Sequence, residues 1–244
     1  MTTDAAAIDA QKRAAGEAAA TLARSGMRLG LGTGSTIFFT IEALGRMHQQ
    51  GALTDIVTVA TSERTAAQAR GLGLPVRDLS EVLTLDLTID GADEVDPSLR
   101  LVKGLGGALL REKIVASSSA SMAVVVDAGK LVARLGTRSP LPVEVDPFGW
   151  RATHEKISRL GCAPHLRETA EGQPYRTDGG HYILDCHFEH GIDAPDDLER
   201  VLNMIPGVID SGLFIGIAHR IIVGGEASVR EMVAGGALRP FSAG

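Results

Sequence analysis

The chain has 244 residues, of which 44% are hydrophobic and 22% are charged, and its formal net charge at pH 7 is −6. This composition excludes an intrinsically disordered chain, and the length suffices to bury a sizeable core. A net negative charge without any basic run argues against nucleic-acid binding, so an anionic ligand needs a local positive site.

Cysteine usage and the N-terminus narrow the class further. Cys162 and Cys186 form no CxxC pair, and no histidine spacing resembles a zinc site, so we expect neither a metal nor a disulfide framework. The alanine-rich N-terminus predicts an amphipathic helix and not a signal sequence. No apolar run approaches the roughly 20 residues that a membrane span needs. We therefore expect a cytoplasmic enzyme without a membrane partner.

The first strand, predicted at residues 27–31, runs into a glycine-rich loop and then a helix with apolar periodicity. Glycines permit close backbone approach, hydroxyls donate hydrogen bonds, and a helix N-terminus favours an anion, so the loop predicts a phosphate cradle. Its members are Thr33, Gly34, Ser35 and Thr36. It is not the dinucleotide fingerprint, because Ser35 stands where GxGxxG needs glycine, and the Walker lysine is missing. A tight turn with a helix cap is the simpler alternative.

The following elements predict a doubly wound, mostly parallel sheet. A strand at 55–60 precedes a helix with Ser62 as its N-cap, and residues 74–76 form a third short strand. Strand, helix and strand in this order imply right-handed parallel connections. The continuous apolar run at 122–126 predicts a buried parallel strand, whose polar end is followed by Lys130. We expect the tail after Gly235 to be loosely ordered.

The stretch from residue 90 to 113 carries the most chemistry. A predicted strand at 83–90 delivers Asp90 at its carboxyl end, where open α/β sheets place their ligands. Asp93 and Lys103 follow, and glycines then open a helix over 108–116. Winding that helix at 3.6 residues per turn puts Glu112 in its apolar sector, which predicts a raised carboxyl pKa and suits a general base.

A second unit begins where Pro140, Pro142 and Pro147 punctuate the sequence. We expect strands at 141–145, near His165 and at 181–188, with helices at 148–160 and 194–204. This order predicts a small α+β domain. The division is then a Rossmann-like catalytic domain at 1–136 and 214–244, with a small α+β domain at 137–213 inserted late in the chain.

Proton abstraction next to a carbonyl of a sugar phosphate needs the groups that these stretches supply. It uses a phosphate anchor, a carboxylate base and a cation that stabilises the enediolate, with no cofactor. The motifs GLGTGSTI, DGADEVD, KGLGGALLREKIVA, DAGK and PLPVEV resemble, in order and spacing, those of the type A ribose-5-phosphate isomerases. The resemblance extends from the N-terminal helix to about Gly224.

The resemblance implies interconversion of D-ribose 5-phosphate and D-ribulose 5-phosphate in the pentose phosphate pathway, by a homodimer or homotetramer without a cofactor or metal. Glu112 resembles the family's proton-transferring base, Asp90 and Asp93 the groups that assist ring opening and hold sugar hydroxyls, and Lys103 the enediolate stabiliser. The implied substrate-binding residues are Thr33, Gly34, Ser35, Thr36, Gly91, Ala92, Gly104, Leu105, Gly106 and Lys130.

Two details of the comparison concern single positions. Leu105 stands where relatives often have glycine, which leaves the chemistry intact but affects the flexibility of the loop. Lys12 falls where relatives carry a lysine near the phosphate.

Two alternatives belong to other classes of protein. An amino-sugar phosphate deaminase or a CoA transferase shares a related fold, but a deaminase needs a histidine-containing catalytic motif, and none surrounds Glu112. A sugar-phosphate sensor without turnover normally carries a DNA-binding helix pair, and it has no reason to keep a carboxylate in an apolar helix sector.

Overall fold

The structure is a computed structural model that describes residues 2–225 and 228–243. Residues 1, 226, 227 and 244 belong to the ranges predicted for the Rossmann-like domain, and they lie outside the described residues.

The largest sheet has seven strands in the order β14-β13-β12-β6-β3-β1-β2. The five strands from β12 to β2 pair in parallel, and β13 and β14 are added antiparallel at one edge. The predicted mostly parallel sheet is thereby confirmed. Its strands are β1 (Arg28–Leu31), β2 (Val57–Ala60), β3 (Leu87–Asp90), β6 (Met122–Asp127), β12 (Arg220–Gly224), β13 (Val229–Met232) and β14 (Leu238–Pro240).

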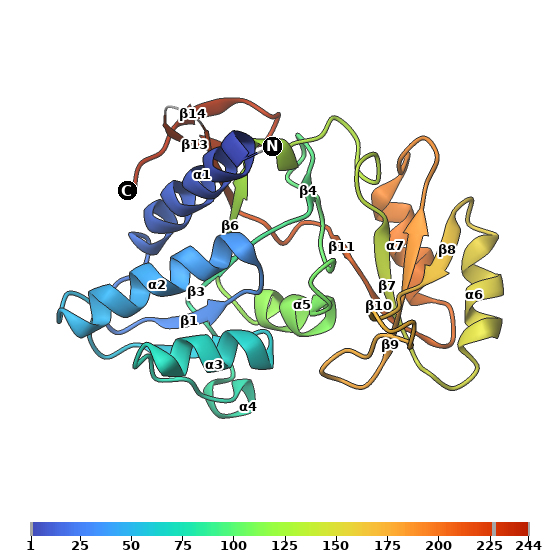
Figure 1. The fold of residues 1–244 in the computed structure, drawn as a ribbon, viewed down its shortest axis with the longest axis horizontal. Helices are drawn as coiled ribbons and strands as arrows, with labels where there is room; N and C mark the ends of the chain where they lie inside the picture. Colours follow the sequence, from blue (N-terminus) through green and yellow to red (C-terminus); the bar gives the residue numbers. More distant parts are fainter. Residues whose placement is uncertain (1, 226–227, 244) are drawn as a thin grey trace.

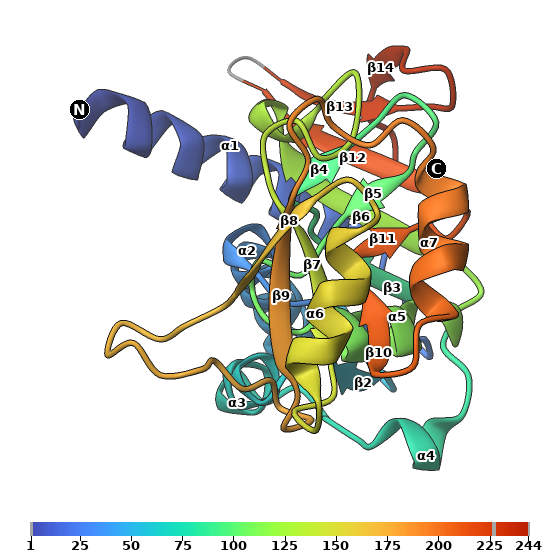
Figure 2. The same ribbon diagram turned by 90° about the vertical axis from the view of Figure 1, so that its right-hand side faces the viewer.

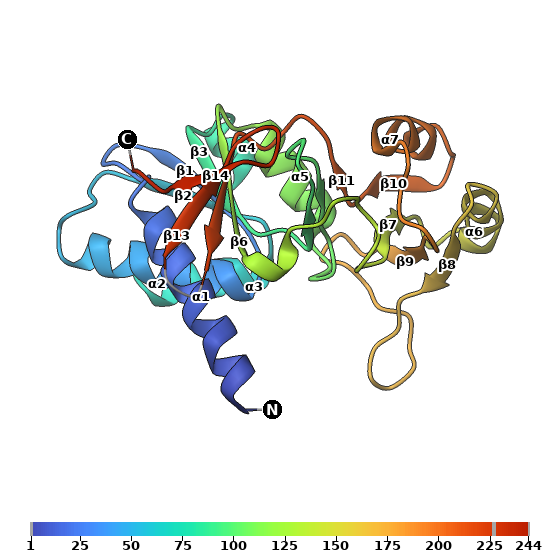
Figure 3. The ribbon, with the colours of Figure 1, turned by 90° about the horizontal axis from the view of Figure 1, so that it is seen from above.

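Helices cover both faces of this sheet because the side chains of its central strand alternate between two apolar clusters. Ala123 and Val125 of β6 pack with α1 and α2, whereas Val124 and Val126 share a cluster with Ala116 of α5. Figure 1 shows α1 and α2 side by side, and Figure 3 shows the first turns of α1 projecting from the rest of the chain. The helices on this sheet are α1 (Thr2–Ala20), α2 (Ser35–Gln49), α3 (Glu63–Gly71), α4 (Leu79–Val82) and α5 (Leu109–Ser117).

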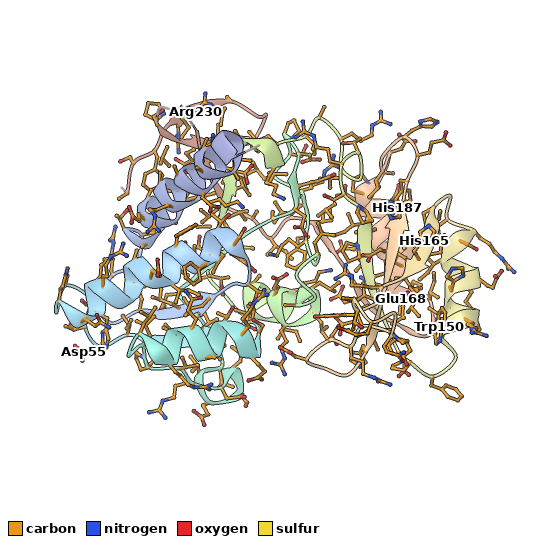
Figure 4. The ribbon with its side chains drawn as sticks, viewed as in Figure 1. Asp55, Trp150, His165, Glu168, His187 and Arg230 are labelled. Carbon is orange, nitrogen blue, oxygen red and sulfur yellow. The ribbon has the colours of Figure 1, made fainter. Side chains whose placement is uncertain are left out.

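A separate antiparallel sheet of four strands has the order β10-β7-β9-β8 and packs against α6 and α7 (Figure 1). The labelled side chains of His165, His187 and Glu168 lie on this side in Figure 4, whereas Asp55 and Arg230 lie on the side of the large sheet. The elements are β7 (Leu141–Val145), α6 (Trp150–Ser158), β8 (Ala163–Leu166), β9 (Tyr182–His187), α7 (Pro195–Asn203) and β10 (Val208–Ser211).

Three short strands form a third sheet between the other two, in the order β11-β5-β4. They are β4 (Glu94–Val95), β5 (Leu101–Val102) and β11 (Leu213–Phe214), and a 3₁₀ turn, η1 (Ala128–Lys130), follows β6. Glu94 links this sheet to the segment that leads into β7, since its carboxylate accepts the N–H groups of Gly136, Arg138 and Ser139.

Three predictions about local structure were wrong. Residues 74–76 make a single parallel bridge, between Val76 and Thr58, because the chain then turns at Asp78, the N-cap of α4. The strand predicted at 83–90 begins only at residue 87, since α4 ends at Val82 and its C-cap, Leu83, has a φ of 65°. The tail after Gly235 is ordered as β14, because its backbone pairs with β13 and its Arg239 binds Glu231.

Other local predictions were confirmed. The side chain of Ser62 accepts the N–H of Thr65 and caps α3. The parallel strands β3 and β6 are buried along their whole length, as expected for strands covered on both faces. Within residues 2–225 and 228–243, no helix has the length and apolar character that crossing a membrane requires.

Candidate active site

Three neighbouring parallel strands, β1, β3 and β6, end at the same edge of the large sheet, and the loops that follow them converge there. Together with the segment after β5 and with α5, they surround a cavity of about 240 Å³. The cavity is lined by Thr33, Gly34, Ser35, Thr36, Arg64, Gly91, Ala92, Asp93, Lys103, Gly104, Gly106, Glu112 and Lys130.

The N-terminus of α2 forms one wall of the cavity. Gly34 precedes the helix with a φ of 146°, which is accessible to glycine, and no side chain caps the first turn. The first N–H groups of a helix have no partner within the helix, so they favour an anion in front of Ser35 and Thr36. Phosphate binding at this helix N-terminus stays a prediction.

The hydroxyl of Thr33 does not face that anion position. Its Oγ1 lies 2.8 Å from the hydroxyls of Thr61 and Ser62 and 3.1 Å from that of Thr65, in a buried network at the start of α3. Thr33 therefore ties the cradle to α3, and its side-chain hydroxyl is already engaged.

Asp90 lies behind the cavity and does not line it, since its side chain is 0% exposed. Its Oδ1 accepts the N–H groups of Thr33 at 3.1 Å and Gly91 at 2.7 Å, so it joins the cradle to the loop after β3. A Cβ at position 32 would lie 2.0 Å from this oxygen, which explains the glycine there. Asp93 does line the cavity, and its Oδ2 accepts the N–H of Leu105 at 2.9 Å.

Lys103 is buried between two carboxylates. Its Nζ donates to the Gly91 carbonyl at 2.6 Å and lies 3.0 Å from Asp90 Oδ2 and 3.3 Å from Glu112 Oε2. Burial disfavours the ammonium, but the charges of Asp90 and Glu112 outweigh this cost and raise the pKa of Lys103 above its ordinary value. The cavity therefore holds a permanent cation at its wall.

Glu112 is 3% exposed, on the first turn of α5, among the buried side chains of Leu109, Val115 and Ala116. Burial and the charge of Asp90 raise the pKa of Glu112 to about 8, although Lys103 acts in the opposite direction. Burial also raises the pKa of Asp90. Of the two carboxyls that share Lys103, Asp90 accepts two additional backbone N–H groups, so Asp90 holds the negative charge and Glu112 is the one that takes up a proton.

Comparison with known proteins assigns the family. The model of the family described as ribose 5-phosphate isomerase A (phosphoriboisomerase A) matches residues 57–228. Ribose-5-phosphate isomerase A from Synechococcus sp. (strain JA-3-3Ab) is 50% identical over 228 residues, which cover 93% of this chain and 98% of that relative. The chain belongs to the ribose 5-phosphate isomerase A family. Members of this family interconvert ribose 5-phosphate and ribulose 5-phosphate.

Solved structures of ribose-5-phosphate isomerases have the same fold. One, a D-ribose-5-phosphate isomerase in complex with phospho-erythronic acid, has a TM-score of 0.89 and 40% identity, and covers 92% of this chain and 98% of its own. Ribose 5-phosphate isomerase from Plasmodium falciparum also has a TM-score of 0.89, with 34% identity and coverage of 91% and 97%. The similarity extends over both the large and the small sheet.

Most residues predicted for a ribose 5-phosphate isomerase A site lie around the one cavity. Among the predicted set, Asp90 lies behind the cavity wall, and Leu105 is not a lining residue: it is 41% exposed, and its N–H donates to Asp93. Lys12, on α1, does not line the cavity. The chemical roles of these residues stay predictions.

Arg64 was missed by the sequence reasoning. It is the second residue of α3, it lines the cavity, and its Nη2 would lie 3.9 Å from a Cβ at position 106. The available signal was its place four residues after the end of β2, a fourth parallel strand at the same edge. This signal is weak, because a lone arginine on a helix surface is ordinarily solvated.

Proposed function

We propose that the protein interconverts D-ribose 5-phosphate and D-ribulose 5-phosphate by proton transfer through an enediolate, with Glu112 as the base. The observation that carries this proposal is a carboxyl group with a pKa of about 8 at the wall of a cavity of about 240 Å³, 3.3 Å from a buried ammonium. A base works best when its pKa lies near the working pH, and this value meets that condition.

In the proposed reaction the carboxylate of Glu112 removes the proton from C2 of the open-chain aldose. Electrons of the broken C–H bond form the C1–C2 double bond, and negative charge develops on the C1 oxygen. The ammonium of Lys103 stabilises this charge, because a buried cation needs no reorganisation during the reaction. Glu112 then returns the proton to C1 while the C2 oxygen becomes the carbonyl, and the proton of the C2 hydroxyl passes to the negative C1 oxygen, which ends as the C1 hydroxyl of the ketose.

Ring opening and phosphate binding are assigned to the rest of the cavity. Asp93 faces the cavity and serves the sugar hydroxyls, whereas Asp90 supports Lys103 and the cradle from behind. The phosphate binds at the N-terminus of α2, with Ser35, Thr36 and Lys130 around it. Gly91, Ala92, Gly104 and Gly106 line the remainder of the cavity and supply backbone contacts to the sugar.

We also propose the division into a domain at 1–136 and 214–244 and a smaller one at 137–213. In support, β7 to β10 share one antiparallel sheet, and the chain enters the β11-β5-β4 sheet at Leu213. The cytoplasmic location and the homodimer or homotetramer stay predictions.

Turnover of ribose 5-phosphate in D₂O by wild type and Glu112→Gln tests the proposed function. We expect wild type to form ribulose 5-phosphate with deuterium at the exchanging carbon. Glu112→Gln binds ribose 5-phosphate in calorimetry but turns it over about 10²- to 10⁴-fold more slowly, since that is what a positioned base contributes.

The matched control is Glu81→Gln, which removes an exposed carboxyl outside the cavity. We expect this variant to keep wild-type turnover. Near-wild-type turnover by Glu112→Gln, or an inactive wild type, refutes the proposal.

A further inference from the structure

The connection between β8 and β9 leaves the small sheet and reaches the large one. Figure 2 shows it as a long loop that extends away from β8 and β9. Near its end, Asp178 Oδ2 accepts the N–H of Glu63 at 3.0 Å and lies 3.4 Å from Arg111 Nη1. The connection therefore contacts α3 and α5, the two helices beside the cavity.

Arg167, at the start of this connection, binds the backbone of the segment after β5. Its Nη1 donates to the carbonyl of Gly104 at 3.0 Å and to that of Leu105 at 3.1 Å. Its Nε donates to Asp185 Oδ2 at 2.8 Å, and Nη2 pairs with Oδ1 of the same carboxylate. With only 13% of its side chain exposed, the guanidinium is held rigidly between the carboxylate and the two carbonyls.

By holding the carbonyls of Gly104 and Leu105, Arg167 also fixes the direction of the N–H group on the other side of each peptide. A trans peptide is planar, so its N–H points away from its carbonyl, and the described residues contain no cis peptide bond. The N–H opposite the Gly104 carbonyl belongs to Leu105, and it donates to Asp93. The N–H opposite the Leu105 carbonyl belongs to Gly106, which lines the cavity. Within residues 2–225 and 228–243 this N–H has no acceptor.

Tyr175 holds the same segment from the other end. A Cβ at Gly107 would lie 2.2 Å from the Tyr175 hydroxyl oxygen, so the tyrosine packs directly on this backbone. The Arg167 guanidinium lies 5.8 Å from the centre of the Tyr175 ring. Gly104 and Gly107 have φ values of 105° and 81°, so the segment depends on glycine and on these outside contacts for its shape.

We propose that Arg167 is a positioning residue that fixes residues 104–106 so that the Gly106 N–H donates to an anionic oxygen of the sugar phosphate. The inference rests on the proposed function and extends it to the small sheet, because Arg167 directly follows β8 and its partner Asp185 lies on β9. The anionic oxygen belongs either to the developing enediolate or to the phosphate, and both are met by the same kind of preorganised donor.

Steady-state kinetics with ribose 5-phosphate for wild type, Arg167→Gln and Arg176→Gln test the inference. Arg176 is a matched control, since it lies in the same connection, donates to the Gly180 carbonyl and stacks on a tyrosine without contacting residues 104–106. We expect Arg167→Gln to lower kcat/KM about tenfold or more, because small misplacements of catalytic groups have effects of this size. Arg176→Gln keeps wild-type values. A fall in kcat at constant KM assigns the N–H to the enediolate oxygen, and a rise in KM at constant kcat assigns it to the phosphate.

A purely structural role of Arg167 is tested by rescue. Arg167→Lys keeps a cationic donor, and guanidinium ion added to Arg167→Ala refills the space between Asp185 and the two carbonyls. We expect both to recover part of the lost activity, with sodium chloride at equal concentration as the control. Wild-type kinetics in Arg167→Gln, or a loss that neither treatment recovers, overturns the inference. An inactive wild type overturns the proposed function instead, so the two failures are distinguishable.

Discussion

If Glu112 is the base, the rate of isomerisation falls as pH falls below the raised pKa of its buried carboxyl group. The carboxylate is the active form, and burial together with the charge of Asp90 raises its pKa to about 8. As pH falls below this value the base becomes protonated and kcat/KM declines tenfold per unit. At pH 6 about 1% of the carboxyl is ionised, so kcat/KM is about 100-fold below its alkaline plateau.

The charge of Asp93 offers a way to shift the acid limb, which is the part of the pH profile where kcat/KM declines as pH falls. Asp93 also raises the pKa of Glu112, because its negative charge disfavours a second one nearby. Asp93→Asn removes that charge, and we expect the acid limb to shift to lower pH whatever happens to the plateau. The position of the limb thus reports on Glu112 separately from any role of Asp93 in ring opening.

The assay is kcat/KM for ribose 5-phosphate measured from pH 5.5 to 9.5 for both proteins, with thermal unfolding as a check of the fold at each pH. A substrate phosphate has a second pKa of about 6, so its titration is separable from a limb near 8. An acid limb for wild type centred below about pH 6, or an upward shift in Asp93→Asn, would contradict the assignment of Glu112 as a buried base.

Three further predictions concern stability, the glycine loop and the missed arginine. The pKa of Glu112 is raised from its ordinary 4.5 to about 8, so the stability that this carboxyl contributes is present below pH 4.5 and is lost as pH rises to 8. In unfolding experiments we expect Glu112→Gln to have the same free energy of unfolding as wild type near pH 4.5. At pH 7 we expect its free energy of unfolding to be higher than that of wild type by on the order of 3 kcal/mol. Equal stability at both pH values would contradict the buried charge. Gly32→Ala puts a Cβ 2.0 Å from a buried carboxylate oxygen, so we expect the free energy of unfolding by denaturant to fall by about 1–3 kcal/mol and turnover to fall clearly. The control is Gly71→Ala, whose added Cβ has nothing within 4 Å, and we expect it to leave both quantities nearly unchanged. Arg64→Ala should raise KM about tenfold at nearly constant kcat, since it removes a cation from the cavity wall. The control is Arg70→Ala, on the same helix but outside the cavity. Equal KM values in the two variants would exclude a role for Arg64.

Much of the fold followed from local patterns in the sequence. The apolar run at 122–126 predicted a buried parallel strand, and the periodicity of the helix that begins near residue 108 predicted that Glu112 faces apolar surface. Both were confirmed because the repeat of a helix or strand fixes which side chains share a face. The tail after Gly235 was not predictable in this way, since its residues are largely exposed and it is held by backbone pairing to β13.

For the site, the sequence by itself determined which chemical groups are present and at which strand ends and helix starts they lie. Only the tertiary structure decided how they pair. It buries Asp90 behind Lys103 and turns the Thr33 hydroxyl toward α3. It also brings Arg167, which follows β8 of the small sheet, to the carbonyls of Gly104 and Leu105, which lie about 60 positions earlier in the chain. These contacts join residues far apart in sequence, and their distances depend on how strands and sheets pack, so no local periodicity encodes them.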